Sequence, residues 1–426
     1  MFCLCSFFPQ LGWSKRANKV VYGEILDMES ILTNNITLFA ITACAFIICY
    51  FMIPVIINVS HLKGLFDKPD YRKLHQFATP NLGGVAIFAA LLISFSISGY
   101  AMVPWAPYLV AGLTILFFAG LKDDILVISA NKKLLLQCVA IAIIIGGSSL
   151  SINNFGGVFG IDQIPPWAGY AVTFFTMVVV LNAYNLIDGL DGLAGGIGLI
   201  ASLFFGIWFY QVGMMEHAAL ALILSATLLA FLCYNFQPAS IFMGDTGSQI
   251  VGYLLVFFAV VFVQTGITSQ QPVPFQNAVP VLVLAVLIVP LYDTIRVFAI
   301  RVFKGHSPFK ADRRHVHHQL VDFGFSHRAS CLIIYGFNLF IIGLTIILAD
   351  ININALFAIV LLTTVILFPT AHFKRGLLIK LGFQVPSPDH ISTLEKKIMV
   401  VPKSIGFNKK KENPSSKIEE AEEVAV

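Results

Sequence analysis

Charged residues are scarce in this chain. Asp, Glu, Lys and Arg make up 12% of its 426 residues, and hydrophobic residues make up 57%. Soluble proteins average about 25% charged residues. No soluble core could bury so much apolar surface. The composition therefore excludes an ordinary soluble globular protein and predicts an integral membrane protein.

Cysteine patterns typical of disulfide scaffolds or zinc sites are also missing. Most of the seven cysteines lie inside apolar segments, where cysteine behaves as a small hydrophobe. Cys3 and Cys5 have no partners at zinc-site spacing. The apolar segments show no period-two polar alternation either, which favours membrane helices over a β-barrel.

About 11 apolar segments are long enough, at ~20 residues each, to cross a bilayer as helices. They cover residues 37–58, 82–100, 103–121, 134–149, 167–184, 193–211, 217–235, 247–265, 277–297, 331–349 and 351–369. The stretches 93–121 and 331–369 could each form one long span instead of two, so ten spans is the alternative. The predicted fold class is all-α, a polytopic integral membrane protein.

Lys and Arg are missing from every second connection between these segments. Residues 149–166, 212–216, 266–276 and 350 include none, whereas the other connections with their flanks, and the tail from 370, contain all those after residue 36. The positive-inside tendency places the basic side in the cytoplasm. The acidic motifs described below share these connections, which predicts an active site at the cytoplasmic face.

The two ends of the chain differ from its apolar middle. Residues 1–36 are predicted to be an N-terminal extension, and residues 1–27 a dispensable or misassigned part of it, because Met28 stands just before the first clear span. Residues 37–370 form the predicted membrane-embedded domain. Residues 371–426 are the predicted cytoplasmic tail, interfacial at first and disordered further on.

A pair of aspartates follows the third predicted span. Asp123 and Asp124 end the sequence Gly-Leu-Lys-Asp-Asp. Adjacent carboxylates can hold a hydrated Mg²⁺ or position a proton, but a charged stop at the membrane boundary explains the pair equally well. Lys133, near the start of the next helix, could meet a phosphate, although snorkelling is the commoner explanation of such a lysine.

The connection before residue 193 has a denser polar pattern. Asn182, Asn185, Asp188 and Asp191 precede a run of glycines that permits a tight turn and close ligand approach. A structural turn needs only one or two such residues, and ionisable groups near membrane depth are usually functional. The pattern therefore predicts a catalytic or binding site.

Two further connections add candidate residues. In Phe242-Met-Gly-Asp-Thr-Gly-Ser248, Asp245 lies between glycines and is a candidate metal or phosphate ligand, while Phe242 either packs or stacks on a nucleobase. Backbone N–H groups there offer an anion site. Asp293 and Arg296, three residues apart, are predicted to pair on one helix.

The longest basic connection carries a histidine cluster. His315, His317 and His318 follow Arg313 and Arg314. A zinc site is conceivable, but no cysteine accompanies them and their spacing is not that of a helical pair. Cations and imidazoles suit oxyanions better.

Arg72 and His75 bring further cationic groups to the same side. Carboxylates and amides for a metal, cations for phosphates and glycine loops for close approach together predict a Mg²⁺-assisted phosphoryl-transfer site.

Four blocks of sequence resemble a known family. They are Thr79-Pro-x-x-Gly-Gly84, Gly120-x-x-Asp-Asp124, Asn182-x-x-Asn-x-x-Asp-Gly-x-Asp-Gly192 and Phe242-x-Gly-Asp-x-Gly-Ser248. Over residues 37–370 the chain is similar to polyprenyl-phosphate N-acetylhexosamine-1-phosphate transferases. The histidine block, with Ser-Pro-Phe-x-Ala-Asp before it, looks like the bacterial UDP-GlcNAc:undecaprenyl-phosphate branch.

The resemblance implies an activity and its partners. A membrane-embedded undecaprenyl (polyprenyl) phosphate attacks the β-phosphorus of a UDP-N-acetylhexosamine, most simply UDP-GlcNAc, and UMP leaves. The implied cofactor is Mg²⁺, with Mn²⁺ as a substitute. The implied location is the bacterial cytoplasmic (inner) membrane, with membrane lipid as a partner, no nucleic acid, and a homodimer as one possible state.

The resemblance also carries roles to matching residues. Asn185 and Asp245 look like Mg²⁺ contacts, and Asp191 and Phe242 look like uridine contacts. Asp123 and Asp124 would position or deprotonate the acceptor phosphate, with Asp188 a further catalytic carboxylate. The histidines with Arg313 and Arg314 would handle the sugar or diphosphate, and the remaining expected substrate contacts are Lys133, Asn182, Arg72 and His75. Val127 stands where many relatives have a third acid, so any role of that acid is absent here.

Other functions compete with this one. Transfer of phospho-MurNAc-pentapeptide is the nearest alternative, but that branch usually has Pro-x-His-His-His-x-Glu, where this chain has Gln319-Leu320. A secondary transporter would place polar groups near the bilayer midplane and often shows inverted repeats. No repeat is visible here, and the polar residues crowd one face. A lipid-binding scaffold would not need paired acids and histidines.

Overall fold

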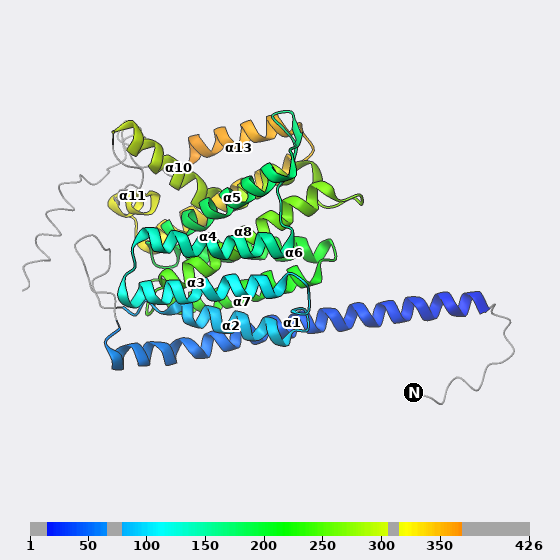
Figure 1. The fold of residues 1–426 in the computed structure, drawn as a ribbon, viewed down its shortest axis with the longest axis horizontal. Helices are drawn as coiled ribbons and strands as arrows, with labels where there is room; N and C mark the ends of the chain where they lie inside the picture. The colour runs from blue at the N-terminus through cyan, green and yellow to red at the C-terminus, as the bar shows by residue number, and fades with distance from the viewer. Residues whose placement is uncertain (1–14, 66–78, 306–314, 369–426) are drawn as a thin grey trace, which may run out of the picture. The chain divides into compact units, whose positions relative to one another are not determined.

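The computed structural model describes residues 15–65, 79–305 and 315–368, with side chains from residue 34 onward. This part is almost entirely helical (Figure 1). The elements are α1 (Lys15–Lys63), α2 (Gly83–Ile97), α3 (Ala106–Leu126), α4 (Ala130–Ser148), β1 (Asn154–Val158), β2 (Ile161–Gln163), α5 (Pro166–Leu186), α6 (Leu193–Gln211), α7 (Met215–Asn235), α8 (Gly244–Thr268), η1 (Gln276–Ala278), α9 (Val279–Val286), α10 (Ile288–Phe303), α11 (Val316–Asp322), α12 (His327–Ile347) and α13 (Ile353–Leu367). The described residues all belong to one compact unit of the chain, Met1–Phe373.

Several helices have the length and composition of membrane spans. Among the described residues, seven pass both criteria, and an eighth does so if the pair α9–α10, bent by 61°, counts as one span. The chain is therefore a multi-pass helical membrane protein. The predicted number of about 11 stays a prediction, because α2 and α13 are short and α3 falls outside the set.

Two local features depart from the predicted elements. The apolar run 277–297 does not form one straight helix, because the chain bends between α9 and α10. Residues of the connection 149–166 form an antiparallel hairpin in which Asn154 pairs with Gln163 and Val158 with Ile161. Glycines at positive φ, such as Gly160 at +76°, allow its tight turn.

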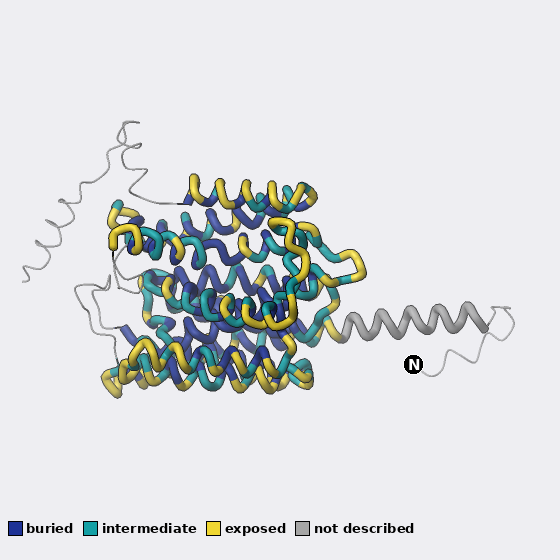
Figure 2. Tube along the Cα trace, turned by 45° about the horizontal axis from the view of Figure 1, so that its top comes forward, coloured by how far each residue is buried: buried dark blue, intermediate teal, exposed yellow. Residues whose placement is uncertain are grey.

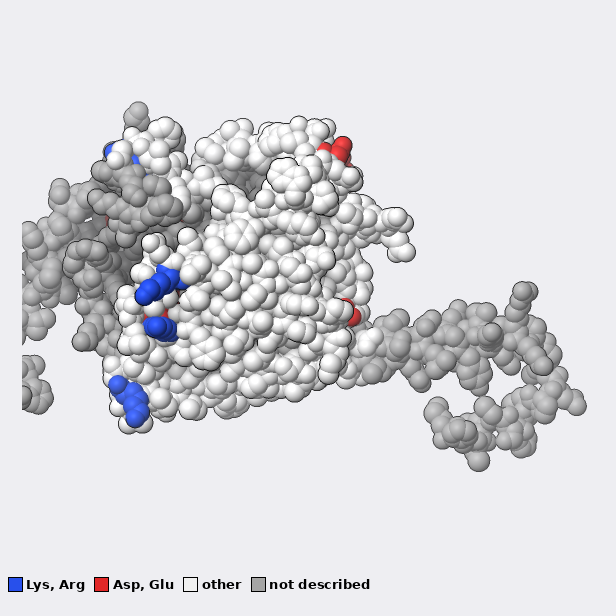
Figure 3. Space-filling view, viewed as in Figure 1, with Lys and Arg blue, Asp and Glu red and all other residues white. Residues whose placement is uncertain are grey.

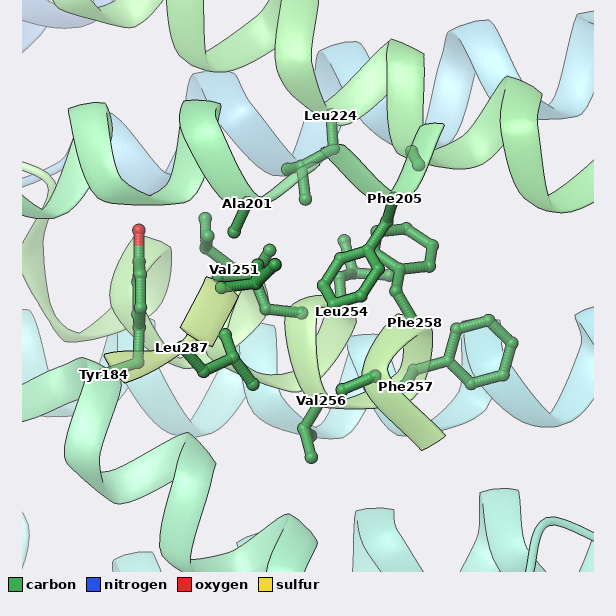
Figure 4. Close-up of a cluster of buried hydrophobic side chains, with 14 of the residues drawn as sticks. Tyr184, Ala201, Phe205, Leu224, Val251, Leu254, Val256, Phe257, Phe258 and Leu287 are labelled. Atoms are coloured by element: carbon green, nitrogen blue, oxygen red, sulfur yellow. The ribbon is translucent and has the colours of Figure 1, made fainter. Parts of the chain in front are cut away.

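Helix α8 is the centre of the bundle. It packs against α2, α3, α5, α6 and α9, and 83% of its most apolar window is buried inside the protein. A helix that is apolar all round is expected in such a place. Figure 4 shows Val251, Leu254 and Phe258 of this helix among the side chains of its neighbours, and Figure 2 shows the buried backbone lying inside a more exposed outer layer.

Glycines bring two helices directly against the first turn of α8. A Cβ atom on Gly84 would overlap the backbone of Gly247, and one on Gly120 would overlap that of Thr246. Small residues allow this close backbone approach in membrane helix packing. The first two sequence blocks therefore hold α2 and α3 at the start of α8.

Lys and Arg after residue 36 lie at one end of the bundle, in the part of the chain that the structure describes. Figure 3 shows Lys and Arg at the end where α10 and α11 lie, and acidic groups at the other end. The connections β1–β2, α6–α7 and α12–α13 with their flanks carry Asp162, Glu216 and Asp350 and no Lys or Arg. The predicted segregation of Lys and Arg after residue 36 is confirmed for the described residues.

Candidate functional site

The second aspartate of the Asp-Asp pair caps the central helix. Asp124 Oδ1 accepts a hydrogen bond from the backbone N of Asp245 at 2.7 Å. Its Oδ2 accepts from the backbone N of Thr246 at 3.0 Å and from the hydroxyl of that residue at 2.6 Å. Burial raises the pKa of Asp124 to about 6, although these hydrogen bonds oppose the shift. The carboxylate satisfies orphan N–H groups at the start of α8.

Asp245 receives donors from two distant elements. Lys133 Nζ, from α4, donates to Asp245 Oδ1 and lies 3.2 Å from Asp123 Oδ2. Asn185 Nδ2, from α5, donates to the same Asp245 oxygen at 2.7 Å and to Ser248 Oγ at 2.7 Å. Burial, and then the hydrogen bond shared with Asp245, raise the pKa of Asp123. The Asp245 side chain is still 33% exposed, so it can meet a ligand.

Three amide side chains form a hydrogen-bonded row that reaches α8 one turn after Asp245. Asn182 Nδ2 donates to Gln137 Oε1 at 3.0 Å, and Gln137 Nε2 donates to Gln249 Oε1 at 3.4 Å. Both glutamines are fully buried. The amide nitrogen of Asn182, a residue predicted to contact the substrate, is thus hydrogen-bonded to protein groups. The glutamines lacked a sequence signal, because each stands alone in an apolar run.

Asp188 lies in the turn after α5, where its carboxylate makes no hydrogen bond or ion pair with other described residues. Burial raises its pKa to about 8, and the nearby charges of Asp245, Asp124 and Asp191 add to the shift. Like charges held this close favour either a retained proton or a bound cation.

One face of α12 holds the end of the same turn. His327 Nδ1 lies 3.6 Å from Asp191 Oδ2, and Cys331 Sγ donates to the backbone O of Asp191 at 3.2 Å. One turn further on, Tyr335 donates its hydroxyl to Gly192 O. Residues four apart share a helix face, so this spacing was a signal that the sequence analysis missed.

The histidine block lies against this turn. A Cβ on Gly189 would come within 2.6 Å of His317 Nε2, and the His317 ring lies 5.9 Å from that of His315 and 4.3 Å from that of His318. Glycine therefore makes room here for a protein side chain, where close ligand approach was predicted. His317 is 1% exposed. Burial and then neighbouring His318 hold its pKa well below the usual value.

Some of the remaining predicted residues are described by the structure, and others lie outside the described residues. Phe242 donates its backbone N to Pro80 O at 2.7 Å and accepts from Gly83 N at 2.9 Å, which joins the first and fourth blocks. The predicted pair of Asp293 and Arg296 is confirmed at 2.7 Å. The other predicted positions lie outside the described residues; they are Arg72, His75, Arg313 and Arg314.

The donor set suits a hard divalent cation. Among the described residues no group of three or more His, Cys, Asp or Glu side chains could hold a metal. Mg²⁺, however, typically takes one or two carboxylates and completes its shell with water and substrate phosphates. The carboxylates of Asp123 and Asp245, both within reach of Lys133, offer such a set.

These features define a class of protein: a multi-pass membrane protein with an acid-rich polar site at its basic end. The family model described as glycosyl transferase family 4 matches residues 106–263, which include three of the four blocks. The chain belongs to this family, and the predicted resemblance is confirmed.

Curated relatives extend the match. A protein of Bacillus subtilis (strain 168), called a probable undecaprenyl-phosphate N-acetylglucosaminyl 1-phosphate transferase, is 33% identical over 283 residues, 66% of this chain and 76% of its own. The undecaprenyl-phosphate alpha-N-acetylglucosaminyl 1-phosphate transferase of Yersinia pestis is 33% identical over 282 residues, 64% of this chain and 73% of its own. The protein of that name from Escherichia coli (strain K12) is 29% identical over 282 residues, 65% and 74% of the two chains.

Proposed function

We propose that this protein transfers N-acetylglucosamine-1-phosphate from UDP-GlcNAc to undecaprenyl phosphate, releasing UMP and starting a lipid-linked cell-envelope glycan. The observation that carries the proposal is the convergence of Lys133, Asn185 and Asp123 on Asp245. These residues come from separate elements of a chain whose relatives have this activity in their names.

A Mg²⁺ ion is the proposed cofactor, with Mn²⁺ as a substitute. Asp245 and Asp123 would hold it, with Asn185 contributing its amide oxygen after a half-turn of the side chain. When bound, the ion neutralises charge on the diphosphate of the donor. The support is the donor set described above and the hard-oxygen preference of the ion.

The residues of the chain supply position and charge. Lys133, at 16% side-chain exposure, is placed to attract a phosphate oxygen. The second pKa of a phosphate monoester is about 6, so the acceptor is mostly dianionic at neutral pH. Asp123 therefore matters more for placing the acceptor than for removing a proton. Positioning and charge neutralisation supply most of the proposed catalysis.

The proposed orientation places this site at the cytoplasmic face of the bacterial inner membrane, with about 11 spans in total. The support is the segregation of Lys and Arg after residue 36 toward one end of the bundle, among the described residues (Figure 3). A UDP-sugar donor would reach the site from that side.

The donor specificity can be tested with purified protein, Mg²⁺ and undecaprenyl phosphate. We expect UMP release with UDP-GlcNAc and none with UDP-MurNAc-pentapeptide. Replacing Asp245 with Ala should abolish release, because the contacts of Lys133 and Asn185 converge there. Asp162 is an exposed residue of β2. The variant Asp162→Asn is therefore the control and should retain activity. Wild-type turnover by the Asp245→Ala protein would contradict the role of this residue, and a preference for the pentapeptide donor would contradict the proposed substrate.

A further inference from the structure

His315 is held by a carboxylate from a different helix. Asp293, in α10, is fully buried. Its Oδ2 lies 2.8 Å from His315 Nδ1, and its Oδ1 accepts from Val316 N at 3.0 Å and from Arg296 Nη2 at 2.7 Å. Both oxygens of this carboxylate are therefore engaged, and they tie the start of α11 to α10.

This contact fixes which nitrogen of His315 carries the proton. An ionised carboxylate can only accept hydrogen bonds, so the Nδ1 of His315 must be the donor. Arg296 compensates the buried charge of Asp293. Within the described part of the chain, His315 Nε2 has no hydrogen-bond partner. It is the ring nitrogen that remains for another molecule.

The ring of His315 is also close to the turn that carries Asp188. It stacks on His317 at 5.9 Å and an interplanar angle of 14°. His317 in turn lies against Gly189. His315 is thus placed next to the turn that carries Asp188 and Gly189, and its Nδ1 is held by the carboxylate of Asp293. The same arrangement orients ligand histidines in metal sites and the base of hydrolase triads.

We propose that Asp293 is a positioning residue that holds His315 in the Nδ1–H tautomer and directs Nε2 to the donor's sugar or diphosphate. This inference rests on the proposed transferase function of the site. A neutral ring accepts a hydrogen bond at Nε2 from a sugar hydroxyl or amide, and a reversed tautomer would present a donor there instead.

Asp293→Asn separates positioning from a merely structural role. The amide oxygen can still accept from Val316 and Arg296, so α11 stays tied to α10. The amide nitrogen, however, takes the place of Oδ2 and donates to His315 Nδ1, which moves the ring proton to Nε2. The corresponding change in the serine protease triad keeps the geometry and lowers kcat about 10⁴-fold.

The test combines ¹⁵N-histidine NMR with kinetics on the full-length protein in detergent, with the His315 signal assigned by His315→Gln. We expect the Nδ1–H tautomer in the wild type and the Nε2–H tautomer in Asp293→Asn. The kcat for UMP release should fall by about 10²-fold or more, with KM for the UDP-sugar changing less. The double variant Asp293→Asn/His315→Gln should have a kcat less than about twofold below that of His315→Gln alone. The effects of two substitutions are not additive when one residue acts through the other.

Three results would overturn the proposal. They are a wild-type kcat in Asp293→Asn, an Nε2–H tautomer of His315 in the wild type, and a double variant whose loss in kcat equals the product of the losses in the two single variants. The wild-type tautomer can be measured even if the Asp293 variant does not fold. If the wild type released no UMP, the proposed function would fail, and the tautomer measurement would still decide the role of Asp293.

Discussion

Asp245 combines the tasks of anchoring and binding in a single side chain. One of its oxygens accepts from Lys133 and Asn185, which stand 112 and 60 residues away in sequence, and its backbone N is capped by Asp124. The carboxylate is therefore fixed in place while a third of the side chain stays exposed. A preorganised charge of this kind is worth more than a mobile one, because no reorganisation is needed during the reaction.

Replacing Lys133 tests the charge balance of the cluster. Lys133→Ala should lower UMP release by about 10²-fold or more, because the side chain neutralises two carboxylates and attracts phosphate. Lys132→Ala is the matched control, since that neighbour is exposed and should retain wild-type rates. UMP formation by both variants at saturating Mg²⁺ is the measurement. Equal losses in the two variants would point to general surface charge instead.

Asp188 should make the stability of the metal-free protein depend on pH. Its pKa is raised from 3.8 to about 8 in the folded protein, so the folded state binds more protons than the unfolded state between these values. Stability should then fall as the pH rises from about 4 to about 8. Asp188→Asn should lose less stability over this range. Thermal unfolding in detergent with EDTA, at pH 5 and pH 8, measures the difference, and parallel curves for the two proteins would refute the assignment.

At the scale of elements, α2 and α3 meet the first turn of α8, and this turn carries Asp245. Asp124 caps this helix from α3, and Gly84 and Gly120 let α2 and α3 touch its first turn. The order of the sequence blocks therefore reflects a packing requirement as well as chemistry. A shift of this turn would move Asp245 away from Asn185 and Lys133.

Gly120→Ala should disrupt this packing. The added Cβ would overlap the backbone of Thr246, and overpacking typically costs about 1–3 kcal/mol of stability. Both the melting temperature and UMP release should fall. Gly146→Ala is the control, because a Cβ there meets nothing within 4 Å. Equal melting temperatures and full activity in both variants would show that the close packing of α3 on α8 contributes neither to stability nor to catalysis.

The sequence predicted the helices well where apolar runs are continuous, and less well where geometry depends on distant contacts. The bend between α9 and α10 lies inside an apolar run, and its local signal is Pro290, which has no N–H to donate to the carbonyl of Val286 at the end of α9. The hairpin of β1 and β2 was read as a plain connection because glycines weaken a strand pattern. The motifs predicted candidate residues, of which the structure brings Asn185 and Asp245 together. Their partners Gln137, Gln249 and His327 were missed because such contacts span many residues.

For the whole molecule, the separation of charge is the property that sequence and structure share. Among the described residues after residue 36, Lys and Arg gather at the end of the bundle that holds the Asp-rich site, and the opposite end shows acidic groups without Lys or Arg (Figure 3). The apolar helices between them match a bilayer by length and composition. This separation allows a water-soluble donor and a lipid acceptor to meet at one boundary, which the proposed reaction requires.

The most direct test of the account is the phosphorus balance of the reaction. Purified wild-type protein is incubated with Mg²⁺, UDP-GlcNAc and undecaprenyl phosphate, and both products are quantified by mass spectrometry. The account predicts UMP and a polyprenyl diphosphate sugar in equal amounts, because the bond between the two phosphates of the donor is broken. Release of UDP with a monophosphate-linked sugar, or no lipid product at all, would contradict it.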